Sequence, residues 1–265
     1  MRRSLPMRRI ATACLTLALI GCSAPGAMRG ALPSPGAETG DVAAADPEEW
    51  RWEEDLDDEI PLAVYDPIQP FNRGVFWIND KLYSYLFKPV ARVYRVVPEP
   101  ARTSVSNVFS NLSTPVRFVN ALLQFKGTLA GHELARLFVN TTFGIGGLFD
   151  VAKTYGGLAK HDEDFGQTLG HYGVGPCFYL VLPVLGPANL RDGVGRVADL
   201  FLDPLYYLGT SGEEEGLAIA LRAWDFENRL SLDKDTYESI KEEQIDPYLF
   251  IRDAYAQRRE AQIEK

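Results

Sequence analysis

Three short clusters carry residue types that metal or phosphate chemistry would need. His132-Glu133 begins like the helical metal-binding pair of zinc proteases, but Arg136 stands where the second histidine ligand should be. His161 precedes three acidic residues that could bind a metal weakly. No further His or Cys lies nearby in the sequence, so a turn of local charge is the better interpretation. The glycines of residues 144–147 lack the Gly-Lys-Ser/Thr of a phosphate cradle. These spacings predict neither a metal nor another cofactor.

Nucleophilic catalysis finds equally little support. The sequence has no Gly-x-Ser-x-Gly turn that would expose a serine nucleophile. His171 stands alone beside Tyr172, and a lone histidine is more often a hydrogen-bonded structural group. A periplasmic lipid hydrolase would require His171 or Asp192 to join a site that the sequence does not reveal. The sequence therefore predicts no catalytic residues and a protein that is not an enzyme.

Cys22 is the position with a recognisable covalent chemistry. An uncharged apolar run from Ile10 to Ile20 follows a basic stretch and ends in a small residue and a cysteine, Leu19-Ile20-Gly21-Cys22. This order resembles the lipobox of bacterial lipoproteins, which implies that Cys22 is acylated and becomes the first mature residue. Ser23 after the cysteine implies sorting to the outer membrane. The alternatives are an ordinary signal peptide or a membrane helix, but a run of 11 residues is too short to span a bilayer.

Loss of residues 1–21 makes an acidic chain more acidic. Four arginines leave with the signal, which takes the formal net charge from −9 to −13. Phosphate backbones and anionic surfaces repel such a chain, so nucleic acid is not an expected partner. The 244 residues that remain suffice for one large domain.

The domain organisation follows from changes in composition. Residues 23–46 are rich in Ala, Gly and Pro, and the next segment is acidic with Trp50 and Trp52, so both predict a chain segment without a packed core. The predicted order is a signal peptide (1–21), a lipidated N-terminus with a flexible acidic tether (22–64), one domain (65–258) and a charged C-terminal tail (259–265).

The periodicity of large apolar residues predicts a mainly α fold. Apolar residues recur at helical spacing over residues 71–87, 105–112, 118–123 and 129–138, and we expect Pro89 and Pro115 to end the first two helices. Strand signals are scarce. From Glu213 onward, dense charge with apolar residues at helical spacing predicts helices with one face in water.

A charge-free stretch interrupts this pattern between Phe165 and Leu190. It has 26 residues, yet five glycines and three prolines argue against a continuous transmembrane helix. Gly173 and Gly175 are permissive backbone positions at the base of what we interpret as an apolar hairpin. The residues expected on its arm are Phe178, Leu180, Leu182, Pro183 and Leu185. Burial in the protein core and insertion into a membrane are equally good interpretations of this stretch.

A set of motifs stands in fixed order along residues 65 to about 258. They are Asp66-Pro67, Pro70-Phe71-Asn72-Arg73, Asn79, Val97-Pro98, Ser106-Asn107, Asn140-Thr141, Asp150-Val151-Ala152, Phe165-Gly166, Thr168-Leu169-Gly170-His171-Tyr172-Gly173-Val174-Gly175, Leu190-Arg191-Asp192 and Asp246-Pro247-Tyr248. Together these motifs resemble the MlaA (VacJ) family of outer-membrane lipoproteins. One departure is Pro176-Cys177, where the family has Tyr-Gly-Pro.

The resemblance implies both a fold and a function. It implies a ring-like assembly of short amphipathic helices around a central channel, lodged in the outer membrane from the periplasmic side of a Gram-negative bacterium. Phospholipids mislocalised in the outer leaflet would pass through it to a periplasmic carrier (MlaC-like), which preserves lipid asymmetry, and a trimeric outer-membrane porin would be bound.

The resemblance also implies roles for particular residues. Gly173 and Gly175 would act as the hinge of a hairpin that gates the channel, and Ile78 and Asn79 would lie at the channel rim. The alternative function is a structural envelope lipoprotein that scaffolds porins without moving lipid.

Overall fold

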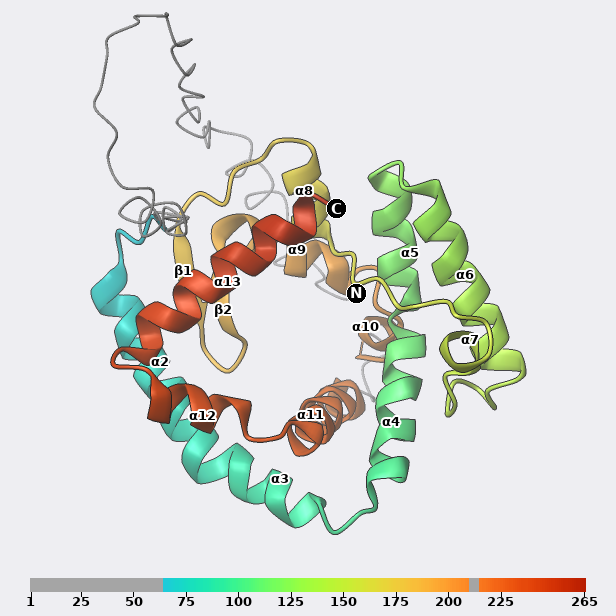
Figure 1. The fold of residues 1–265 in the computed structure, drawn as a ribbon, viewed down its shortest axis with the longest axis horizontal. Coiled ribbons are helices and arrows are strands. Elements are labelled where there is room, and N and C mark those ends of the chain that lie inside the picture. Colours follow the sequence, from blue (N-terminus) through green and yellow to red (C-terminus); the bar gives the residue numbers. More distant parts are fainter. Residues whose placement is uncertain (1–63, 210–214) are drawn as a thin grey trace, which may run out of the picture.

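A computed structural model describes residues 64–209 and 215–265, which are mostly helical (Figure 1). The first half contains α2 (Gln69–Leu82), the π-helical turn η1 (Tyr83–Phe87), α3 (Lys88–Tyr94), α4 (Glu99–Leu112), α5 (Thr114–Leu123) and α6 (Gly127–Thr142). The second half contains α7 (Val151–Thr154), α8 (Phe165–His171), β1 (Tyr179–Leu182), β2 (Gly186–Asn189), α9 (Leu190–Leu200), α10 (Pro204–Gly209), α11 (Glu215–Leu232), α12 (Thr236–Glu243) and α13 (Pro247–Ile263). The predicted mainly α class is confirmed. The signal peptide, Cys22 and the acidic tether lie outside the described residues.

Prolines mark helix starts in this chain, as expected for a residue that lacks an N–H. Pro100 and Pro115 stand in the first turns of α4 and α5. Pro89 was wrongly predicted to end the first helix. The backbone passes through it from η1 into α3, because the π-helical turn before Pro89 widens the helix and Lys88 donates its N–H to the carbonyl of Tyr83, five residues earlier.

The charge-free stretch contains a short antiparallel hairpin. Tyr179 pairs with Asn189 at its base, and Leu182 pairs with Gly186 at its tip. Val184 (φ 66°) and Gly186 (φ 76°) take left-handed conformations that turn the chain. Each strand has a single neighbour, so Pro187 fits in β2 without breaking a ladder between three strands.

The elements follow a ring-shaped path in Figure 1, with α2, α3, α4 and α5 along one part and α8, α9 and α13 along another. Helix α13 contacts α2 at one end and α8 at the other, and so connects the two parts. At its start Asp246 pairs with Arg73 of α2 at 2.7 Å, and near its end Arg259 pairs with Asp164 at 2.8 Å. The segment predicted to be a charged tail, 259–265, is therefore helical as far as Ile263, and Arg259 holds α13 against α8.

Many polar side chains are buried in this fold, and many large apolar side chains are exposed. Among the described residues, buried polar and charged side chains outnumber buried apolar ones, half of which are alanines. The largest fully buried side chains are Gln167, Glu133, Val181, Asn72, Asn120, Asn228 and Thr114. Hydrogen bonds and ion pairs between buried polar side chains, more than an apolar core, hold the helices together.

Many large apolar side chains are exposed, and two sets of them lie on neighbouring elements. One set, the α5–α6 apolar surface, comprises Leu122, Leu123, Phe125, Leu134, Phe138, Phe143, Ile145 and Phe149. The other lies on α2, η1 and α3 and comprises Phe71, Trp77, Ile78, Tyr85, Leu86, Val90 and Val93. Surfaces of this kind mark contact with membrane or protein. Within residues 64–209 and 215–265, none of the helices is both long enough and apolar enough to cross a membrane.

Candidate functional site

Two asparagines of α2 bind the hairpin through its backbone. Asn72 donates its amide to the carbonyl of Tyr179 at 3.0 Å and accepts the N–H of Val181 at 3.0 Å. Asn79 does the same nearer the tip, donating to Leu182 at 3.0 Å and accepting from Val184 at 2.8 Å. The two side chains lie two helical turns apart and therefore point from the same face of α2. We call this pair the asparagine clamp.

Asn72 of the asparagine clamp is linked to α13 through Asp66. Asn72 also donates to Asp66 at 2.8 Å, and Asp66 accepts the hydroxyl hydrogen of Tyr248 on α13. The Tyr248 ring packs edge-on against Tyr179 of β1, with ring centroids 6.1 Å apart. The base of the hairpin is thus fixed between the first and the last described helices.

The hairpin is buried at its body and exposed at its tip. Tyr179 and Val181 belong to an apolar cluster with Val75 and Tyr248. The arm residues Phe178, Leu180 and Leu182 are half-buried, whereas Pro183 and Leu185 are exposed. At the expected rim, Ile78 has 48% of its surface exposed, while Asn79 is half-buried against the hairpin. The core interpretation therefore describes the body of the hairpin, and the tip is free to contact a ligand.

The two glycines predicted to form a hinge have different backbones. Gly173 follows the end of α8 with φ 83°, and the N–H of Val174 reaches back to the carbonyl of Leu169 at 3.0 Å. The N–H of Gly173 bonds the carbonyl of Gly170 at 2.8 Å, so this is a Schellman motif that ends the helix. Gly175 does not take the left-handed conformation. A side chain at Gly173 is therefore the costlier of the two changes.

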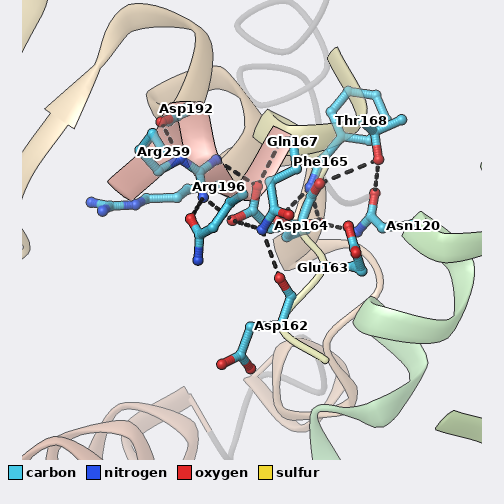
Figure 2. Close-up of polar contacts among 12 residues, drawn as sticks. Asn120, Asp162, Glu163, Asp164, Phe165, Gln167, Thr168, Asp192, Arg196 and Arg259 are labelled. Atoms are coloured by element: carbon cyan, nitrogen blue, oxygen red, sulfur yellow. Dashed lines mark hydrogen bonds and ion pairs between the residues drawn. The ribbon is translucent and has the colours of Figure 1, made fainter. Parts of the chain in front are cut away.

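An ionic cluster joins α8, α9 and α13 (Figure 2). The guanidinium of Arg259 contacts both oxygens of Asp164, at 2.8 and 2.9 Å, and Asp192 at 2.7 Å. Burial alone would raise the pKa of Asp164 and of Asp192, but hydrogen bonds and the charge of Arg259 hold both below the ordinary value. Both carboxylates are therefore charged at neutral pH, and Arg259 is their shared counter-ion.

Asp192 connects this cluster to the hairpin. It pairs with Arg191 at 3.0 Å, and Arg191 donates to the carbonyl of Val174, between the two glycines, at 3.2 Å. Asp192 also accepts from Asn189, the last residue of β2, at 2.9 Å. The segment that carries the hairpin is thus bonded at both ends to one buried carboxylate and its partner.

Asp199 is the carboxylate of this region without an ion pair among the contacts found in the described residues. It accepts the N–H of Phe165 at 3.1 Å and the amide of Asn120 at 2.8 Å. Burial raises its pKa to about 6, although these two hydrogen bonds act in the opposite direction. Asp199 therefore binds its proton more tightly in the folded chain than in the unfolded chain.

Asp199→Asn is expected to change the pH dependence of stability. Because the folded pKa of about 6 lies above the ordinary 3.8, the folded state binds more protons between these values. The stability that Asp199 contributes is present below pH 3.8 and falls as the pH rises to about 6, by on the order of 3 kcal/mol. Urea unfolding of wild type and Asp199→Asn from pH 4 to 8 measures the difference, and a constant difference across that range would contradict the assignment.

Two residues of the cluster considered for metal binding, Glu133 and Arg136, form ion pairs within the fold. Glu133 is fully buried, pairs with Arg117 at 2.7 Å and accepts the N–H of His161 at 2.9 Å. Arg136, in the position of the missing zinc ligand, pairs with Asp150 at 2.9 Å. No group of three or more His, Cys, Asp or Glu side chains suited to a metal ion occurs in the part of the chain that the structure describes.

The comparison with family models decides the relationship. The model described as "MlaA lipoprotein" matches residues 64–262, which run from before α2 to the last turn of α13. The chain belongs to the MlaA lipoprotein family. The predicted resemblance is thereby confirmed.

Individual MlaA-family relatives agree. The chain is 36% identical over 201 residues to the intermembrane phospholipid transport system lipoprotein MlaA of Escherichia coli strain K12, covering 73% of this chain and 76% of that protein. The protein of the same name from Haemophilus influenzae is 29% identical, with 72% and 76% covered. An uncharacterised protein of Rickettsia felis is 37% identical, with 77% and 80% covered.

A solved structure of similar fold supports the architecture. It was determined for the structural basis of maintenance of bacterial outer-membrane lipid asymmetry, and it superposes with a TM-score of 0.62. It is 36% identical in sequence, and the match covers 75% of this chain and 98% of that chain. The MlaA-family fold therefore extends over nearly all the described residues.

Sequence reasoning missed the residues that seat the hairpin in this MlaA-family chain. Asn72 belongs to the recognised Pro70-Phe71-Asn72-Arg73 motif and stands two helical turns before Asn79, which is a usable signal. Arg259 gave no such signal, because its partner Asp164 is 95 residues away.

Proposed function

We propose that the protein is an outer-membrane lipoprotein that removes mislocalised phospholipids from the outer leaflet and passes them to a periplasmic carrier. By doing so it would maintain the lipid asymmetry of the outer membrane. It works without catalysis of its own and without a metal or nucleotide. Family membership supports the phospholipid transport, because the relatives from Escherichia coli and Haemophilus influenzae are named as parts of an intermembrane phospholipid transport system.

The observation that best supports the proposal is the burial of polar side chains together with the exposure of large apolar ones. A phospholipid needs water or polar groups around its headgroup and an apolar environment around its tails. Exposed aromatic and aliphatic side chains on α2, α3, α5 and α6 suit the acyl region of a leaflet, while polar side chains fill the inside of the helical assembly. A ring with these two faces supplies both environments along one path, through a central channel.

The hairpin is proposed as the gate of that channel. Its tip is exposed and apolar at Pro183 and Leu185, and the asparagine clamp holds it against α2. Release of the Asn79 bonds would free the tip, while the buried Asn72 keeps the base in place. Gly173 and Gly175 would then supply the motion, with Ile78 and Asn79 at the rim.

The remaining parts of the proposal concern anchoring and partners. Acylation of Cys22 would hold the protein in the outer membrane, embedded from the periplasmic side. A trimeric porin would bind the assembly, and an MlaC-like carrier would receive the lipid. The acidic balance of the chain agrees with partners other than nucleic acid.

Vesicle reconstitution tests the proposal. Purified protein is inserted into vesicles of phosphatidylethanolamine and phosphatidylglycerol that contain a fluorescent phosphatidylethanolamine, and transfer to an added MlaC-like carrier is recorded. We expect transfer that depends on both proteins. Absence of transfer, with insertion and carrier binding both verified, would favour the alternative of a structural lipoprotein that scaffolds porins.

Gly173→Ala is expected to impair lipid transfer more than Gly175→Ala. Gly173 has φ 83°, where alanine costs about 1 kcal/mol or more, while no nearby atom would clash with the new methyl group. The change therefore acts on backbone freedom rather than on packing. Transfer rates of both variants in the vesicle assay test this, and wild-type rates in both would remove the hinge from the account.

A further inference from the structure

A hollow of about 230 Å³ lies between the hairpin and the helices that face it. Its walls come from β1, β2 and the tip between them, from α2 with η1, and from α11, α12 and α13. The side chains that matter for the argument are Phe87, Val181, Val184, Phe226 and Ile251, all of which are apolar. The hairpin therefore forms a wall of a cavity as well as a tip that meets solvent.

Polar groups at the edge of the hollow are engaged by other partners. The amide of Asn79 is bonded to the hairpin backbone, the hydroxyl of Tyr83 donates to Glu238 at 2.7 Å, and the hydroxyl of Tyr237 donates to Asp80 at 3.0 Å. A water molecule in a cavity needs two to four polar partners, and these groups present mainly their apolar parts to the space. The hollow is suited to an apolar occupant.

The size of the hollow limits what that occupant can be. It exceeds many times the space that one water needs, yet it is smaller than the roughly 300–1,000 Å³ of sites for whole drug-sized ligands. A diacyl lipid does not fit inside. Part of one hydrocarbon chain does, because a chain is narrow and can enter by its end.

Charged groups stand beside this apolar space. The ammonium of Lys88, whose side chain is 4% exposed, pairs with Glu238 at 2.7 Å and with Asp235, so two carboxylates already satisfy it. Lys241, 39% exposed in its side chain, pairs with Asp80 at 2.5 Å and lies 5.7 Å from the centre of the Tyr237 ring, which lines the hollow. An exposed ammonium next to an apolar hollow matches a molecule that carries a phosphate at one end and a hydrocarbon chain at the other.

We propose that this hollow binds the end of one acyl chain of a phospholipid, with the phosphate near Lys241. The inference rests on the proposed transport function and adds to it a tail site beneath the hairpin. Opening of the hairpin would then remove one wall of the site and release the chain, which couples gate movement to lipid binding.

The test uses phosphatidylethanolamine with a diazirine at the end of one acyl chain, in vesicles that carry the full-length protein. After irradiation, mass spectrometry locates the labelled peptides. Two variants fill the hollow from opposite walls, Ile251→Trp and Val181→Phe. Phe250→Trp is the matched control, because Phe250 neighbours Ile251 on α13, is 40% exposed and does not line the hollow.

In wild type and in Phe250→Trp we expect labels on the hairpin, α11 and α13. In Ile251→Trp and Val181→Phe we expect about tenfold less labelling of these segments. That is the change expected when roughly two methylene groups lose their burial. Thermal unfolding verifies that each variant is folded. Labels confined to the α5–α6 apolar surface, or undiminished in both folded variants, would overturn the site. If wild-type protein transfers lipid without label in the hollow, the tail site fails while the transport proposal stands.

Discussion

Arg259→Ala is expected to lower the free energy of unfolding by about 3–5 kcal/mol, the cost of removing one partner from a buried ion pair. Arg259 is the counter-ion of both Asp164 and Asp192, and its side chain is only 11% exposed. Without it, the buried carboxylate of Asp192 and the half-buried carboxylate of Asp164 lose their shared counter-ion and the hydrogen bonds that it donates. Because α13 joins α2 to α8, the loss would also loosen the contact that closes the ring-shaped path.

Arg258→Ala is the matched control, because this exposed arginine precedes Arg259 on the same helix. Urea unfolding followed by circular dichroism is expected to show a large shift for Arg259→Ala and a change within about 0.5 kcal/mol for Arg258→Ala. Equal, small shifts in both variants would show that the cluster does not hold α13.

Asn72→Ala is expected to have the second largest effect and to act on the hairpin. Asn72 is fully buried, and its loss leaves the carbonyl of Tyr179 and the N–H of Val181 without their side-chain partner. Each such buried group costs about 1–3 kcal/mol. Both backbone groups lie at the base of the hairpin, so we expect its amides to exchange with solvent faster by a factor of ten or more, that is, by at least about 1.4 kcal/mol of opening free energy.

Asn79→Ala serves as the comparison for Asn72→Ala. Asn79 makes the same pair of bonds but nearer the exposed tip, so its loss should free the tip while global stability changes by less. Hydrogen–deuterium exchange of β1 and β2, with thermal unfolding of the same samples, separates the two effects. Unchanged exchange in Asn72→Ala would show that the clamp is not what seats the hairpin.

Local sequence patterns predicted the helices well because their causes are local. Apolar residues at helical spacing mark α4 and α5, Pro115 marks the break between them, and the charge density after Glu213 marks the helical C-terminal part. The same local rule failed at Pro89, because a π-helical turn absorbs the missing hydrogen bond. Such a turn depends on neighbouring packing rather than on proline itself.

The site could be predicted only in part, because its decisive contacts join distant residues. The apolar composition indicated a hairpin, but the clamp connects Asn72 to Val181 across 109 positions, and Arg259 reaches Asp164 across 95. Polar residues in a sequence are also usually assigned to the surface, whereas many of them are buried here. Among the described residues, the helices therefore offer no long apolar segment for a search of the sequence to find.

Lipid removal by this protein is tested by the phospholipid content of the outer leaflet in cells that lack it. Those cells are compared with cells that express wild type or Cys22→Ala from a plasmid, at equal protein levels. We expect a rise in outer-leaflet phospholipid in the deletion, reversed by wild type and not by Cys22→Ala. No rise, with the periplasmic transport partners present and active, would contradict lipid removal as the function.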